Sequence, residues 1–79
     1  MVDNMQLSQG KIGNTYRVLC ADLPVQLEKR MEALGMTVGT CIGILHCKRG
    51  GTMVITIRGT RFAIGKGISQ KIEVTEVKG

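Results

Sequence analysis

Hydrophobic positions follow a helical period in one stretch of the chain. Between residues 24 and 34, Leu27, Met31 and Leu34 recur at i, i+4 and i+7, and charged or polar residues fill most of the other positions. Pro24 suits a first helical turn, because its missing N–H has no partner there, and Gly35 suits the left-handed residue that closes a helix. Asp22 or Leu23 is the expected N-terminal cap. The pattern predicts one three-turn helix.

The chain bends twice after this helix. In a Schellman closure at Gly35, Met36 folds back on Met31, and a second glycine, Gly39, then lets the chain reverse into an extended segment. From there on, apolar and polar residues alternate with the period of two that is typical of strands. Residues 15–20, 40–47, 52–58, 61–64 and 72–77 are the predicted strands.

The connections predict a small barrel. Gly59 at the first central position of a turn predicts a type II′ hairpin, and residues 65–71 predict a single helical or 3₁₀ turn. Residues 5–13 are expected to form an ordered lead-in loop. Five short strands with one helix fit a mainly β fold, closed into a barrel, because closure removes exposed strand edges. We expect a single domain over residues 1–79.

The apolar side of each predicted helix or strand indicates which side chains form the core. Leu27, Met31 and Leu34 are expected to pack against the barrel, and the two aromatic residues, Tyr16 and Phe62, are expected in its interior. The cysteines, Cys20, Cys41 and Cys47, are expected to be small core or half-buried residues.

The number of cysteines and the N-terminal sequence indicate the cellular compartment. Three cysteines are an odd number, and residues 1–6 do not resemble an export signal. No apolar run is long enough to cross a bilayer. We therefore expect a cytoplasmic protein with reduced thiols.

Catalysis and resident metal are not expected. One histidine and six scattered acidic residues offer no nucleophile beside a base, so we predict no enzymatic activity. Cys41 and Cys47 lie about 20 Å apart on an extended strand, and His46 points to the face opposite Cys47. We expect no cofactor or metal site, and leave open an incidental divalent ion at His46.

A net charge of +5 keeps nucleic acid as a rival partner. Arg58 and Arg61 flank one hairpin, and Lys48 and Arg49 lie in another. Proteins that bind single strands on small barrels usually add aromatic side chains on which bases stack, and this chain has two aromatic residues. We therefore interpret the arginines as solvated hairpin ends, and predict no nucleic-acid partner.

Taken together, several segments resemble the FeoA family. They are the lead-in with Leu7, Gly10 and Gly13, the helix at residues 27–31, the bend at residues 34–42, the strands with Gly51 and residues 54–64, and the last strand at residues 72–74. The sequence differs at Val38, where a proline commonly precedes the bend glycine, and at residues 65–67. The resemblance implies an SH3-like barrel that acts in the cytosol as an accessory protein of ferrous-iron uptake. A related domain occurs in iron- and manganese-dependent repressors, so an SH3-like metal-sensing or nucleic-acid-binding module is the alternative.

The resemblance also implies a partner, the cytosolic part of the ferrous-iron permease FeoB, so membrane association would be indirect. We predict contact through the helix and its exit, since methionine side chains suit an adaptable surface. The predicted partner-binding residues are Leu27, Lys29, Arg30, Met31, Leu34 and Met36.

Overall fold

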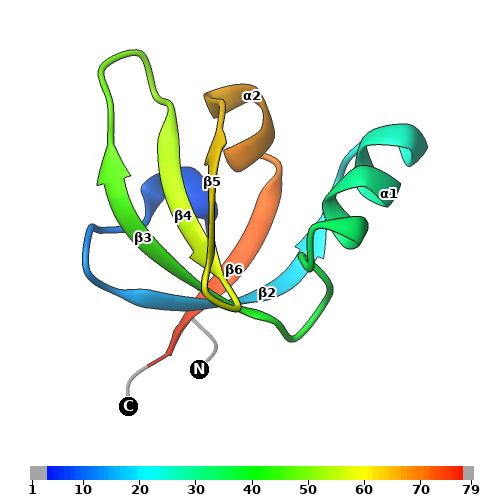
Figure 1. Ribbon diagram of the computed structural model, residues 1–79, viewed down its shortest axis with the longest axis horizontal. Helices are drawn as coiled ribbons and strands as arrows, with labels where there is room; N and C mark the ends of the chain where they lie inside the picture. Colours follow the sequence, from blue (N-terminus) through cyan, green and yellow to red (C-terminus); the bar gives the residue numbers. More distant parts are fainter. Residues whose placement is uncertain (1–3, 78–79) are drawn as a thin grey trace.

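The computed structural model describes residues 4–77, which form six strands and three short helical segments (Figure 1). The predicted absence of an export signal falls partly on residues 1–3, which lie outside the described residues. The elements are β1 (Asn4–Gln6), the 3₁₀ helix η1 (Leu7–Gln9), β2 (Thr15–Ala21), α1 (Val25–Ala33), β3 (Cys41–Cys47), β4 (Met53–Ile57), β5 (Thr60–Ile64), α2 (Lys66–Ser69) and β6 (Ile72–Val77). The predicted helical turn in residues 65–71 is thus confirmed as α2.

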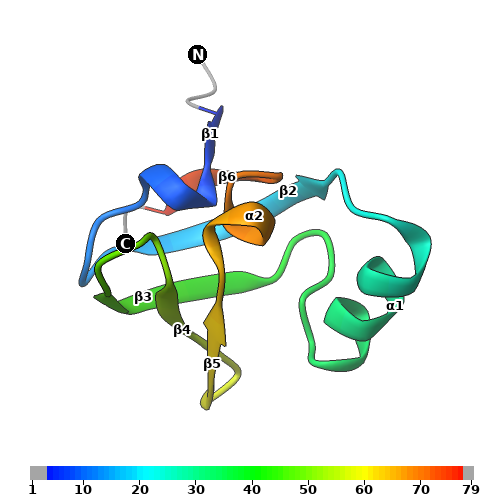
Figure 2. The same cartoon turned by 90° about the horizontal axis from the view of Figure 1, so that it is seen from above.

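All six strands belong to one antiparallel sheet with the order β1-β6-β2-β3-β4-β5. The sheet curls on itself, and η1 contacts α2 in the space between its two ends (Figure 2). The mainly β prediction is therefore confirmed, but two of its details were wrong. Part of the expected lead-in loop is a sixth strand, since Met5 pairs with Val74, and the barrel is not closed, because β1 and β5 do not pair within the described residues.

The interior of the curl is built almost entirely from aliphatic side chains. Tyr16 is the one fully buried aromatic residue among those described, and its hydroxyl accepts a hydrogen bond from the Lys11 backbone N–H at 2.8 Å, which satisfies the polar end of the ring. Phe62 was predicted in the core and is only half-buried. The buried hydrophobic residues are Leu7, Tyr16, Val18, Leu23, Met31, Met36, Ile42, Ile44, Met53, Ile55, Ile57, Ile64, Ile72 and Val74.

The predicted helix closes as expected. Gly35 has a φ of 102°, its N–H donates to the Glu32 carbonyl at 2.9 Å, and the Met36 N–H donates to the Met31 carbonyl at 2.9 Å. These two bonds define a Schellman motif and fold Met36 back over the last turn. The N-terminal cap differs from the prediction, because Pro24 itself takes that position, ahead of the first helical residue.

Two bulges change which side chains face solvent. The register of β2 against β6 shifts between Val18 and Cys20, so Cys20 turns outward although the alternation placed it inside. A second shift lies between Ile44 and His46, and His46 is exposed although the alternation places it on the face of the buried Ile42 and Ile44. Cys41 and Cys47 are also exposed, so the prediction that the three cysteines are core or half-buried residues was wrong.

The turn between β4 and β5 has a different type from the one predicted. Ile57 pairs with Thr60, so the two loop residues are Arg58 and Gly59, with φ of 51° and 83°. Two positive φ angles define a type I′ turn, whereas type II′ has one. Arg58 therefore occupies a left-handed conformation that is costly for a residue with a side chain.

We expect Arg58→Asn to stabilise the fold by about 0.5–1 kcal/mol, because asparagine followed by glycine is the preferred type I′ pair. Urea unfolding followed by circular dichroism measures the change. Arg58→Gln is the control, since it removes the same charge but keeps the strained conformation. An equal gain from both variants would assign the effect to charge instead of backbone.

We expect Gly35→Ala to destabilise the fold by about 1 kcal/mol or more, because alanine is strained at positive φ. The added Cβ would lie 3.4 Å from Ile57 Cγ2, so space is not the main obstacle. Gly65→Ala is the matched control, since its φ of −78° suits alanine and nothing lies near the new methyl group. Thermal unfolding of both variants tests this, and equal melting temperatures would contradict it.

Candidate partner-binding surface

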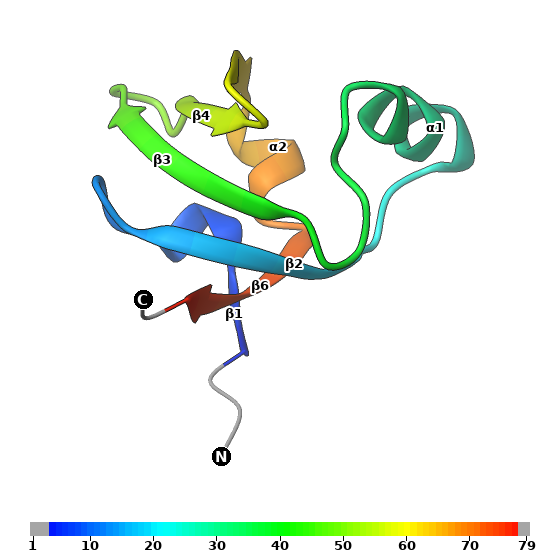
Figure 3. The ribbon, with the colours of Figure 1, turned by 60° about the horizontal axis from the view of Figure 1, so that its bottom comes forward.

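The helix α1 stands beside the curled sheet (Figures 1 and 3). Its inward face was predicted to be core, and the structure confirms this for Met31, which is 7% exposed, and partly for Leu27, which is half-buried. Leu34 was placed in the same group and is 40% exposed, so that part of the prediction was wrong. Among the described residues, no helix is long and apolar enough to cross a membrane.

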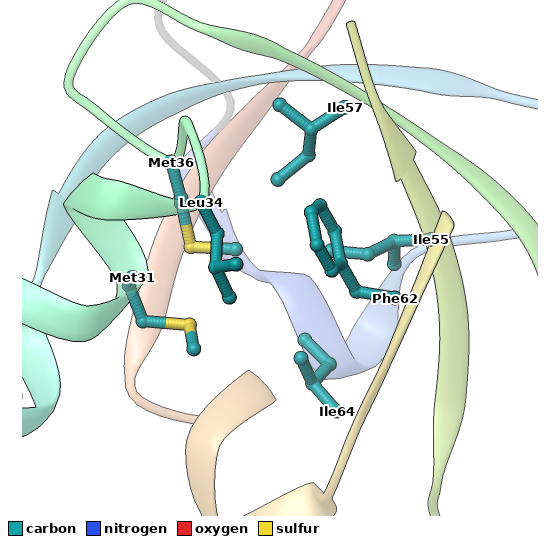
Figure 4. Close-up of a pocket in the computed structure, with 7 residues that line it drawn as sticks. All are labelled: Met31, Leu34, Met36, Ile55, Ile57, Phe62 and Ile64. Atoms are coloured by element: carbon teal, nitrogen blue, oxygen red, sulfur yellow. The ribbon is translucent and has the colours of Figure 1, made fainter. Parts of the chain in front are cut away.

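A narrow apolar seam joins α1 and its exit to β4 and β5 (Figure 4). Its cavity volume is about 10 Å³, which is at the lower limit of what one water molecule needs. The seam is therefore nearly filled by its own side chains, and the exposed part of Leu34 lies at its boundary. On one side lie Met31, Leu34 and Met36, and on the other lie Ile55, Ile57, Phe62 and Ile64.

The two flanks of α1 carry opposite charge. Arg30 lies on the flank of Leu34, and it also lines a shallow hollow of about 270 Å³ with Leu27. Glu28 and Glu32 lie on the other flank, where they line a smaller hollow against β2. The side of the helix that carries Leu34 is therefore the basic side.

The structure brings five of the six predicted contact residues to this region, and Lys29 is the exception. Two residues along a helix turn the side chain by about 200°, so Lys29 lies on the face opposite Met31. Its charge faces solvent away from the seam. Of the two predicted basic residues, Arg30 alone borders the apolar surface.

Sequence reasoning missed two residues of this surface. Phe62 was assigned to the core but forms one wall of the seam, and Val38, in the bend after the helix, is 74% exposed. Val38 lies with Cys41 and Arg58 around a wide, shallow hollow. The sequence did single out Val38, because it stands where the FeoA family, which the sequence resembles, commonly has a proline. The sequence does not show, however, that the bend projects from the sheet.

The His, Cys, Asp and Glu side chains of the described residues can be compared with what a metal ion requires. No three His, Cys, Asp or Glu side chains there are grouped as a metal ion requires. One thiol has a defined partner: Cys20 Sγ donates to Glu73 Oε2 at 3.1 Å. The accepting carboxylate raises the pKa of the Cys20 thiol, first through this hydrogen bond, so the protonated and unreactive form is favoured.

Comparisons with known proteins agree on the fold. A crystal structure described as an iron uptake regulatory protein (FeoA) is 27% identical, with a TM-score of 0.82 over 94% of this chain and 97% of that one. A FeoA-like protein from Clostridium acetobutylicum is 19% identical, with a TM-score of 0.83 over 100% of this chain and 93% of that one. A search of curated proteins gives no match.

The same fold occurs inside a larger protein. A manganese-dependent transcriptional repressor is 19% identical, with a TM-score of 0.86 over 98% of this chain but only 44% of that one. This likeness shows the fold alone, and the predicted SH3-like architecture is confirmed by both kinds of match. The family model that matches residues 5–76 is the FeoA domain. The chain therefore belongs to the FeoA family.

Proposed function

We propose that this chain is a non-catalytic accessory protein of ferrous-iron uptake that binds the cytosolic part of the permease FeoB. Membership of the FeoA family supports the iron-transport role. The observation that carries the binding surface is the partly exposed Leu34, held at the edge of a methionine-lined seam and flanked by Arg30. Exposed apolar side chains next to a basic rim are typical of protein-binding sites.

The seam supplies the adaptability that docking requires. Met31 and Met36 are flexible and polarisable, so their side chains can repack around an apolar group that enters from outside. Leu34 and Val38 lie on either side of Gly35, where the Schellman closure ends the helix, and both side chains are exposed. Binding through this surface would place the protein at the membrane through its partner and in the cytoplasm.

Leu34→Asp tests the surface better than a change at Met31. Met31 is buried, so a charge there would unfold the helix from the sheet, whereas Leu34 already contacts solvent. We expect Leu34→Asp to weaken binding to the soluble cytosolic domain and cytosolic segments of FeoB about tenfold or more, as a central interface residue does. Isothermal titration calorimetry measures the affinity.

Leu45→Asp is the matched control, because Leu45 is 43% exposed and belongs to the C-terminal half of β3, a strand that runs away from α1 (Figure 1). Circular dichroism of both variants verifies the fold. An equal loss of affinity in the two variants, or no loss in either variant, would refute the proposed binding surface. Failure of the folded wild-type chain to bind any cytosolic part of FeoB would refute the function.

A further inference from the structure

The sheet leaves one longer edge strand without a partner. β5 is last in the strand order, and among the described residues its backbone makes no hydrogen bond on the side facing away from β4. The other edge strand, β1, has three residues, whereas β5 has five. A free edge of this kind is a template on which another extended chain can pair.

The turn type identifies which backbone groups lie on that edge. A two-residue loop makes the flanking pair, Ile57 and Thr60, a hydrogen-bonded pair. Hydrogen-bonded and non-hydrogen-bonded pairs alternate along an antiparallel ladder, so Arg61 and Ala63 belong to the second kind. Their N–H and C=O groups therefore point away from β4, while their side chains are exposed.

The same edge borders the apolar seam. Phe62 and Ile64 alternate with the edge residues and face Leu34 and Met31 across the seam (Figure 4). A strand added to β5 lies about 4.8 Å from it, and every second side chain of that strand falls on the face that carries Phe62. A single extended ligand can thus pair its backbone with β5 and, in the same orientation, insert an apolar side chain into the seam.

The surrounding charge specifies the chemistry of that ligand. From residue 33 to residue 72 the sequence contains six basic residues and no acidic one, and these residues form β3, β4, β5 and α2. Arg58 lies in the turn before β5, Arg61 lies near the start of β5 and Lys66 follows its end, while Arg30 lies on the basic flank of α1. β5 itself and its neighbours in sequence, β4 and α2, thus contain no carboxylate that would repel an acidic ligand.

We propose that the free edge of β5 binds an extended acidic segment of the permease by β-strand addition, with an apolar side chain of that segment entering the seam. The identity of the partner rests on the proposed function above. Main-chain hydrogen bonds to Arg61 and Ala63 supply affinity, and the seam and the basic residues supply specificity. A peptide fits better than a nucleic acid, because the free groups are backbone amides and Phe62 is turned into the seam, away from any stacked base.

Ala63→Pro is the decisive variant. Proline removes the N–H that points to the free edge without breaking a hydrogen bond to β4, and proline is tolerated on edge strands in this position. Ala63→Val is the matched control, because it keeps the N–H and suits a strand. Thermal unfolding of both variants verifies that the fold is intact.

The probes are overlapping synthetic peptides that tile the cytosolic segments of FeoB, titrated into the full chain and followed by calorimetry and amide hydrogen exchange. We expect an acidic peptide to bind, to slow exchange at the Arg61 and Ala63 amides, and to lose about tenfold in affinity with Ala63→Pro but not with Ala63→Val. Arg61→Gln is expected to weaken binding and to reduce its dependence on salt.

The other outcomes separate the two proposals. If FeoB peptides bind Ala63→Pro as tightly as the wild-type chain, strand addition is overturned while the proposed function stands. If neither the peptides nor the soluble cytosolic domain binds the wild-type chain, both fail. If a single-stranded oligonucleotide displaces the peptide from the same amides, the edge binds nucleic acid and the acidic-peptide proposal is overturned. If the wild-type chain is a dimer in sedimentation and Ala63→Pro converts it to a monomer, the edge binds a second copy of this chain and the proposal is likewise overturned.

Discussion

Two backbone hydrogen bonds around Gly35 determine how α1 is attached to the sheet. They end the helix, reverse the chain and bring Met36 beside Met31, so that both methionines face Ile55 and Ile57. The helix needs this closure, because it has nine residues and an isolated helix of that length is marginal in water. Packing of a few apolar side chains against β4 and β5 supplies the remaining stability, and it leaves the flank with Leu34 and Arg30 accessible.

Much of the fold could be predicted because two simple periods encode it. The helix, its glycine closure and the approximate positions of five strands follow from spacing and turn residues alone. The sequence does not reveal β1 in this way, since three residues are too few to establish a period, and that strand pairs with the edge of β6. The bulges at Leu19 and Leu45 are equally invisible in a pattern of apolar positions, and the first of them reverses the expected exposure of Cys20.

The candidate partner-binding surface could be predicted only in part from the same periods. Helical spacing placed Leu27, Met31 and Leu34 on one face, but how far a residue is covered depends on the angle at which the helix meets the sheet. That angle follows from the bend after Gly35, which periodicity does not describe. The role of Phe62 was missed for a related reason, because an aromatic residue in an apolar alternation is ordinarily buried on both sides, and here the open edge uncovers it.

The central position of β6 has a consequence for biosynthesis. Among the described residues β6 follows all the other strands in sequence, yet it lies between β1 and β2 and pairs with both. While the ribosome is still translating residues 72–77, β1 has no partner and β2 has β3 alone. The hydrophobic interior is thus sealed only after the other five strands have been synthesised, and the nascent chain carries unprotected strand edges until β6 emerges.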